Sequence, residues 1–282
     1  MDSDPATGPD AAGRVRKRAM LDDTLFSMAT QAVAGMPDVQ CRLYRSPLDG
    51  WEDRVFLRLP SGPGRPWVVV LHGHGSLGDQ LFVREDIRRA WLPVFVEHDV
   101  GILAPDLRGN AWMGPAAEED LNRQIAAVRE AFDVPVFGLV GGSMGGTGVL
   151  IYAGLHPEDV GGVVAYCPAT DLADLVGSLA AAEKDGGEVI GEIRTAIEAA
   201  YGPAGRSDTY ARHSILANHR RLTMPVAVIH GDRDAMIPVS HARRLRERMG
   251  PRLGYREIAG GDHDAPLTCV QPLRELMDHL QA

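Results

Sequence analysis

The stretch Leu139–Leu150, LVGGSMGGTGVL, carries a single serine among five glycines. An apolar segment over residues 136–140 runs into it, and residues 144–155 follow with a helical pattern. This strand–turn–helix setting around G-x-S-x-G predicts a sharp turn that presents Ser143 alone at the end of a strand. The start of the following helix favours negative charge there. We therefore interpret Ser143 as a nucleophile rather than as part of a flexible turn.

Apolar runs of the same form recur along the chain, as WVVVLHG, VGILAPD, VFGLVGG, GGVVAYCP and PVAVIHGD. Strands that are apolar on both faces are typical of a parallel sheet covered by helices on each side. The spacing predicts helices between these strands, over residues 82–98, 116–132, 144–155, 240–249 and 266–280. Residues 39–44 and 51–59 alternate as antiparallel strands do, and residues 255–258 form a last strand. The alternation predicts a doubly wound α/β fold.

Three segments lie outside this rhythm. We expect the first 18 residues to be a disordered tail before a catalytic domain over residues 19–282. Residues 21–36 have helical spacing and end before Pro37. Residues 171–222 hold about fifty residues where a short connection would suffice, with helical stretches at 172–184, 188–201 and 210–218. We interpret this insertion as a small helical cap or lid at the carboxyl ends of the strands, where ligands bind in such sheets.

The composition limits the classes of molecule that we expect the chain to bind. The chain has 282 residues, a formal net charge of -9 and three scattered cysteines. That balance argues against nucleic acid and membranes as partners, and the cysteines favour a reducing, cytoplasmic location. No secretion signal and no membrane-spanning run are recognisable, and the sequence does not determine the oligomeric state. We expect no cofactor, because no phosphate or dinucleotide loop is present, and no metal, since the pair His72 and His74 is the nearest approach to a metal site.

A serine needs a base to take its proton, and the base needs a carboxylate to orient it. Of the ten histidines, His263 is the one in the loop that directly follows the last predicted strand, in the segment AGGDHDAP. Asp234 follows the strand PVAVIHG and is our choice for the acid, with Asp232 and Asp171 as the alternatives.

The oxyanion of an acyl intermediate needs backbone donors. We assign these to the N–H groups of Met144, directly after the nucleophile, and of His74, with Gly75 as second choice. Gly75, Trp112 and Met113 are our candidates for substrate contact, with core packing an open alternative for the last two.

Two further features have structural interpretations. Asp106 and Arg108, in PDLRGN, are interpreted as a pair that fixes their loop. Cys167 has no base near it in the sequence and is interpreted as a small buried thiol.

Taken together, LHGHG, PDLRGN, GGSMGG, HGDRDAMIP and GGDH resemble the α/β-hydrolase superfamily in order and spacing. The segment YARHSILANHRRLTMPVAVIHGDRDAMIPVSHARRL is similar to prolyl-oligopeptidase (S9) catalytic domains and their single-domain esterase relatives. The resemblance implies an eight-stranded, mostly parallel sheet and a triad of Ser143, Asp234 and His263. We expect no propeller domain before the first strands, in contrast to the peptidases, which favours small esters or amides as substrates.

These observations predict a serine hydrolase that cleaves a small-molecule carboxylic ester through an acyl-enzyme. Peptidase or amidase, thioesterase and acyltransferase activities use the same triad and remain alternatives, as does cyclisation or cleavage of a specialised metabolite. An alternative of another class is a ligand-binding protein that keeps the fold without turnover.

Overall fold

The computed structural model describes residues 26–33, 36–182, 187–203 and 208–282 of the chain. The tail expected at residues 1–18 lies outside the described residues.

One nine-stranded sheet runs through the molecule in the order β1-β2-β3-β5-β4-β6-β7-β8-β9. The strands are β1 (Phe26–Val33), β2 (Met36–Arg45), β3 (Glu52–Arg58), β4 (Trp67–Leu71), β5 (Gly101–Pro105), β6 (Phe137–Gly142), β7 (Val160–Tyr166), β8 (Val226–Gly231) and β9 (Leu253–Ile258). Pairing is antiparallel from β1 to β5 and parallel from β5 through β9. The predicted doubly wound, mostly parallel α/β-hydrolase fold is confirmed, with nine strands in place of eight.

The additional strand corrects one prediction. Residues 21–36 were expected to form a helix, but the described part of that segment, β1, is a strand that pairs antiparallel with β2. The outer edge of β2 offers unpaired N–H and C=O groups, and pairing with them outweighs a weak local helical pattern.

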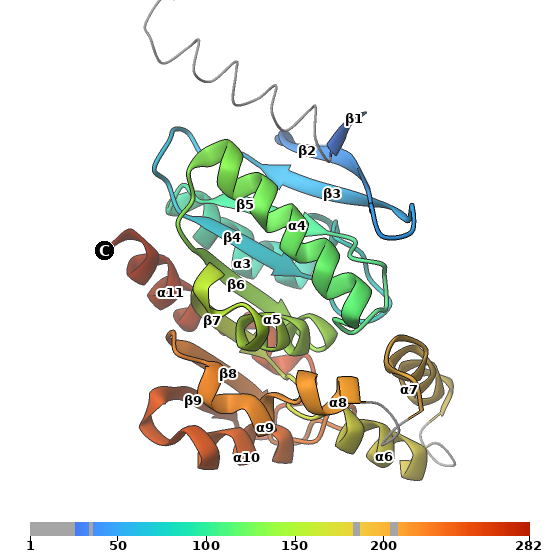
Figure 1. Cartoon of the computed structure of the whole chain (residues 1–282). Helices are drawn as coiled ribbons and strands as arrows, with labels where there is room; N and C mark the ends of the chain where they lie inside the picture. The colour runs from blue at the N-terminus through green and yellow to red at the C-terminus, as the bar shows by residue number, and fades with distance from the viewer. Residues whose placement is uncertain (1–25, 34–35, 183–186, 204–207) are drawn as a thin grey trace, which may run out of the picture.

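Helices cover both faces of the sheet (Figure 1). They are α2 (Gln80–Val83), α3 (Glu85–Glu97), α4 (Pro115–Phe132), α5 (Met144–Leu155), α10 (Ser240–Met249) and α11 (Gln271–Gln281). Buried side chains of α3 and α11 pack together on one face of the sheet, and those of α4, α5 and α10 on the other. The predicted helix over 82–98 is divided at Arg84, whose backbone is extended, and the one over 266–280 opens with a 3-10 turn, Ala265–Thr268.

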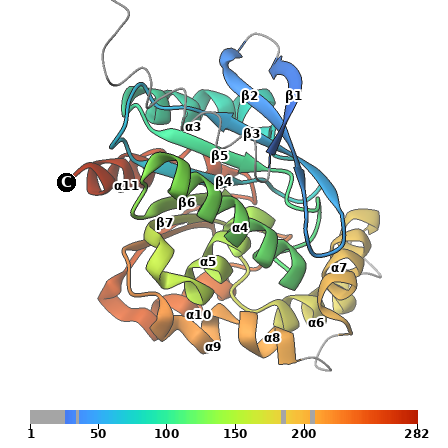
Figure 2. The same ribbon diagram turned by 45° about the horizontal axis from the view of Figure 1, so that its top comes forward.

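The insertion after β7 contains the helices α6 (Leu172–Ala182), α7 (Gly187–Tyr201), α8 (Asp208–His213) and α9 (Ile215–Asn218). Figures 1 and 2 both place α6 and α7 beyond the carboxyl ends of the parallel strands. Ile193 and Ile197 of α7 are buried in the same apolar cluster as α4 and α5. The insertion therefore shares the core of the sheet, and its action as a lid stays a prediction.

Among the described helices, none combines the length and the apolar character that crossing a bilayer requires.

Candidate active site

Ser143 stands at the turn between β6 and α5 with a strained backbone, at φ 57° and ψ -121°. Its N–H donates a hydrogen bond to the carbonyl oxygen of Tyr166, at the end of β7, over 2.9 Å. A Cβ atom on Gly145 would overlap the carbonyl oxygen of Leu71, and one on Gly141 would overlap the backbone of Gly145. Strand and helix thus approach so closely that only glycine fits, which is the close packing that a nucleophile elbow requires.

His263 and Asp234 face each other across two loops that follow β9 and β8. The Nδ1–H of His263 donates to Asp234 Oδ2 over 2.7 Å. The other ring nitrogen, Nε2, is buried and has no hydrogen-bond partner within the described chain. With Nδ1 protonated, the neutral ring carries a free lone pair on Nε2, which is the form in which a histidine acts as a base.

Asp234 is held by four donors. Its Oδ1 accepts hydrogen bonds of 2.9 Å from the N–H groups of Met236 and Ile237. Its Oδ2 accepts from His263 and also lies 3.1 Å from Nε2 of His230, a residue with no exposed surface. These bonds fix the carboxylate so that Oδ2 faces His263.

His230 was missed by sequence reasoning. Its Nε2 lies 2.8 Å from the carbonyl oxygen of Ile237, which only accepts, so the proton is on Nε2. Its Nδ1 is buried without a partner in the described chain, as expected of an unprotonated nitrogen. The spacing His230-Gly-Asp-Arg-Asp234 was the available signal, since the turn after β8 folds residue 234 back onto residue 230.

The two alternative acids have other partners. Asp232 is exposed and accepts a hydrogen bond from the N–H of Gly260 over 2.7 Å. Asp171 accepts from the hydroxyl of Ser214 over 2.9 Å, at the start of the insertion. The structure brings neither of them to His263 and brings Asp234 there.

Electrostatics strengthen the His263–Asp234 pair. Burial alone would raise the pKa of Asp234, but hydrogen bonds from His230 and His263 outweigh it and hold the pKa well below its usual range. Burial alone would lower the pKa of His263, but Asp234 and the neighbouring Cys167 outweigh it and raise that pKa. The carboxylate is therefore ionised wherever His263 titrates.

The loop after β4 supplies one N–H group suited to an oxyanion. The N–H of Gly73 donates to Oε1 of Gln80 over 3.0 Å, and that of Gly75 donates to Oδ1 of Asn110 over 2.8 Å. Within the described residues, no hydrogen bond engages the N–H of His74 or that of Met144. These are the two groups assigned from the sequence, whereas Gly75, the second choice, already has a partner.

The ring of His74 is fixed by Trp112, whose Nε1–H donates to His74 Nδ1 over 3.2 Å. The proton of the neutral imidazole is therefore on Nε2. Burial lowers the pKa of His74, which keeps the ring neutral. A neutral ring with an N–H donor thus stands on the loop that carries the candidate oxyanion donor.

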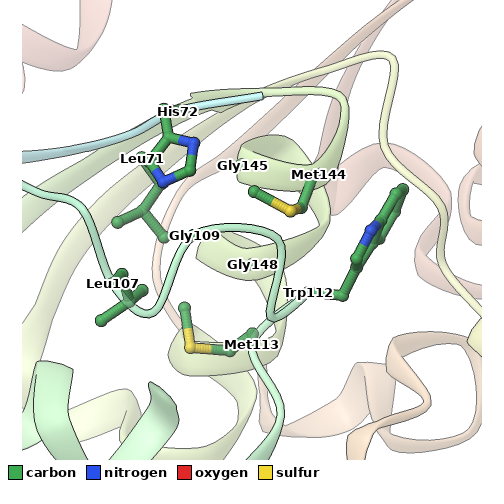
Figure 3. Close-up of a pocket in the computed structure, with 9 residues that line it drawn as sticks. All are labelled: Leu71, His72, Leu107, Gly109, Trp112, Met113, Met144, Gly145 and Gly148. Atoms are coloured by element: carbon green, nitrogen blue, oxygen red, sulfur yellow. The ribbon is translucent and has the colours of Figure 1, made fainter. Parts of the chain in front are cut away.

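A cavity of about 20 Å³ lies beside the elbow (Figure 3). Its lining includes Met144 and Gly145 from α5 and the side chains of Leu107, Trp112 and Met113. Of the three predicted substrate-contact residues, Trp112 and Met113 line the cavity and are also almost fully buried in the core, whereas Gly75 is not among the lining residues. The cavity has room for about one water molecule or a methyl-sized group.

The loop after β5, which forms one wall of the cavity, has a strained backbone that neighbouring groups hold in place. Leu107, Arg108, Trp112 and Met113 all have φ between 45° and 60°, a left-handed conformation that is costly for side chains of this size. Such strain persists only where the surroundings impose it.

Two carboxylates help to hold this loop by binding Arg108. They correct the prediction that Asp106 and Arg108 pair with each other. Arg108 binds Asp49 at 2.7 Å and Asp120 at 2.5 Å. Asp106 instead binds Arg54 at 2.9 Å and accepts from the N–H of Gly78. Both residues fix the loop as expected, but through different partners.

The insertion holds the same wall. Tyr201, the last residue of α7, directs its hydroxyl at the carbonyl oxygens of Trp112 (2.8 Å) and Met113 (3.0 Å). The hydroxyl oxygen also lies 3.0 Å from Nδ1 of His213 in α8. The neutral imidazole of His213 carries one ring proton. Burial lowers the pKa of His213 to about 4, so this contact is made by a neutral ring.

Cys167 differs from its sequence interpretation in one respect. It is a buried thiol, as expected, with none of its surface exposed. It does have a base near it, however, because its Sγ lies within 4.8 Å of a ring nitrogen of His263 and of a carboxylate oxygen of Asp234. Cys167 precedes Asp234 by 67 positions, and Asp234 precedes His263 by 29, so no local sequence spacing predicted the cluster.

Comparisons with known proteins agree with this architecture. Residues 66–185 match a family model described as the alpha/beta hydrolase fold. No curated protein matches the sequence significantly.

Solved structures resemble the chain over most of its length. The fluorophosphonate-binding serine hydrolase FphF of Staphylococcus aureus is 15% identical, with a TM-score of 0.65, and the match covers 86% of this chain and 98% of that one. An S-formylglutathione hydrolase from Agrobacterium tumefaciens is 14% identical with a TM-score of 0.65, over 91% and 100% of the two chains. Est1E from Butyrivibrio proteoclasticus is 16% identical with a TM-score of 0.61, over 85% and 98%. By its sheet order, its elbow and these likenesses, the chain has the α/β-hydrolase fold.

Proposed function

We propose that the protein is a serine hydrolase that cleaves a carboxylic ester of a small molecule, with Ser143 as nucleophile, His263 as base and Asp234 as orienting acid. The 2.7 Å hydrogen bond from His263 Nδ1 to Asp234 Oδ2, at the sheet edge where the strained Ser143 stands, carries the proposal. It leaves the lone pair of Nε2 as the one basic position of the ring.

In the acylation step, Ser143 Oγ attacks the ester carbonyl while His263 Nε2 takes the hydroxyl proton. Asp234 stabilises the imidazolium that forms. The N–H groups of Met144 and His74 hold the oxyanion, and His263 gives its proton to the leaving alkoxide. Water activated by the same nitrogen then releases the acid from Ser143.

The cavity beside Met144 favours a short acyl group. With about 20 Å³ it admits a methyl-sized group, so we expect formyl and acetyl esters to be preferred over longer chains, for which Trp112 or Met113 would have to move. Some of the similar structures are named S-formylglutathione hydrolase, which makes short acyl thioesters the natural second substrate class to measure.

The test of the nucleophile is a fluorophosphonate adduct. We expect mass spectrometry to find it on Ser143 in the folded wild-type protein and to find none in Ser143→Ala or in wild-type protein unfolded beforehand. An adduct on another serine, or none on the folded chain, refutes the assignment.

The test of the substrate class is a panel of p-nitrophenyl esters from acetate to octanoate beside the matching thioesters and anilides. We expect kcat/KM to be highest for acetate and to fall with each added carbon pair. Met113→Ala enlarges the cavity and should move the optimum to longer chains. An optimum at octanoate in the wild type would exclude this cavity as the acyl site. Binding without turnover across the panel would favour the ligand-binding alternative.

A further inference from the structure

Cys167 is held in a fixed position near the candidate site, and the proposed reaction assigns it no role. It follows β7 directly, with φ at 42°, and its N–H donates to the carbonyl oxygen of Ile229 over 2.7 Å. The preceding residue, Tyr166, accepts the N–H of Ser143. The end of one strand therefore fixes both the candidate nucleophile and this thiol.

The thiol completes a set of three ligand types. The Sγ of Cys167, a carboxylate oxygen of Asp234 and a ring nitrogen of His263 all lie within 4.8 Å of one another. In the described part of the chain this is the one group of three or more such residues at that range. Cys167 and Asp234 are buried, and among the described residues Nε2 of His263 has no hydrogen-bond partner.

Thiolate, imidazole and carboxylate together suit a Zn²⁺-like cation, whereas Mg²⁺ and Ca²⁺ take oxygen ligands. Tetrahedral bonds of about 2.0 to 2.3 Å place ligand atoms about 3.5 Å apart, so a closure of at most about 1.3 Å brings this set into range. We propose that Cys167, Asp234 and His263 bind a thiophilic divalent cation of the Zn²⁺ type, and that binding switches the hydrolase off.

The inhibitory effect follows from the tautomers of His263 and rests on the proposed function, whereas the binding itself does not. A cation on Nε2 occupies the lone pair that would take the proton of Ser143. A cation on Nδ1 leaves the single proton of the neutral ring on Nε2. In both cases His263 cannot act as the base, and the proton of the Cys167 thiol is released to solvent on binding.

Binding is measured first, without any need for activity. The full-length Ser143→Ala chain is titrated with Cd²⁺ and followed by the ultraviolet absorption of a thiolate–Cd²⁺ bond. We expect one equivalent to bind, and the signal to disappear when Cys167→Ser or Cys167→Ala is added. Two variants guard against one of them failing to fold, because Cys167 stands in a left-handed backbone conformation.

The chain offers matched controls in its other free cysteines, Cys41 and Cys269. Cys41→Ser and Cys269→Ser should keep the full Cd²⁺ signal. A signal that persists without Cys167, or that disappears with either control, overturns the site.

Inhibition is measured second, on the otherwise wild-type chain with the best ester of the panel. We expect Zn²⁺ to inhibit, EDTA to restore activity, and Mg²⁺ at the same concentration to have no effect. Relative to its own activity without metal, Cys167→Ser should need about tenfold more Zn²⁺ for half inhibition than the wild type. Equal inhibition of wild type and Cys167→Ser overturns the switch. If the wild type hydrolyses no ester, the proposed function fails, while the Cd²⁺ titration still decides the site.

Discussion

Around Ser143 the backbone fixes the geometry, whereas around Asp234 hydrogen bonds to the side chain do so. The serine side depends on a left-handed backbone and on glycines pressed against neighbouring carbonyl groups. The acid side depends on a carboxylate with four donors, two of them imidazoles. The comparison teaches that one added atom disrupts the backbone around Ser143. The surroundings of Asp234 tolerate a change of side-chain shape but not a change of hydrogen bonding.

The largest effect is expected at the acid. Asp234→Asn keeps the size of the side chain but presents an amide N–H to His263, so the ring turns to the tautomer with its proton on Nε2. We expect kcat to fall about 10⁴-fold. The melting temperature should fall as well, because the amide N–H also faces the Nε2–H of His230. The matched control is Asp232→Asn on the same loop, which should keep wild-type kcat. Equal losses in the two variants would contradict the assignment of Asp234.

The second effect concerns the packing of the elbow. In Gly145→Ala the new Cβ overlaps the carbonyl oxygen of Leu71, and backbone atoms yield less readily than side chains. We expect the free energy of unfolding to fall by about 3 kcal/mol, measured by urea denaturation. Gly177→Ala, in α6 with no atom within 4 Å of the new Cβ, should instead gain about 0.5 to 1 kcal/mol. A harmless Gly145→Ala would show that strand and helix are not in contact there.

The third effect is the pH dependence. The pKa of His263 is raised, and only the neutral ring accepts a proton from Ser143. We therefore expect kcat/KM to fall about tenfold per pH unit on the acid side, with a midpoint above the usual histidine value of about 6.5. In Asp234→Asn the residual activity should have its midpoint at lower pH, because the carboxylate that raises the pKa is gone. A wild-type midpoint below that value would argue against the close His263–Asp234 pair.

The smallest effect tests the second imidazole. His230→Met fills the space but removes the Nε2–H that approaches Asp234, and one hydrogen bond to a charged group is worth about 1.5 kcal/mol or more. We expect kcat to fall about tenfold with KM unchanged, whereas His230→Gln, which retains a donor, should recover most of the loss. A lower melting temperature with unchanged kcat in His230→Met would give His230 a structural role alone.

Much of the fold could be predicted because its signals are local. The doubly apolar strands β4 to β8 stop at glycine or polar residues, and α5 and α10 occupy the predicted residues. The error at β1 has the opposite origin, since that strand exists through its partner β2 and its own sequence carries a helical spacing.

The same distinction applies to the site. Ser143, Asp234 and His263 each follow a strand, so order along the chain was enough to choose them. His230 escaped notice because its role depends on the turn that folds Asp234 back against it. Cys167 escaped notice because its neighbours come from two other loops. Tyr201 reaches the cavity wall from a helix about ninety residues away from it in sequence.

That contact of Tyr201 has a consequence for engineering the protein. Loop exchange is the usual way to change selectivity in a fold whose connections vary, and the insertion and the wall at residues 107–113 look like separate modules. Because one hydroxyl joins them through the carbonyl groups of Trp112 and Met113, a foreign insertion without that hydroxyl would leave a strained wall unsupported. A chimera should therefore exchange both segments together.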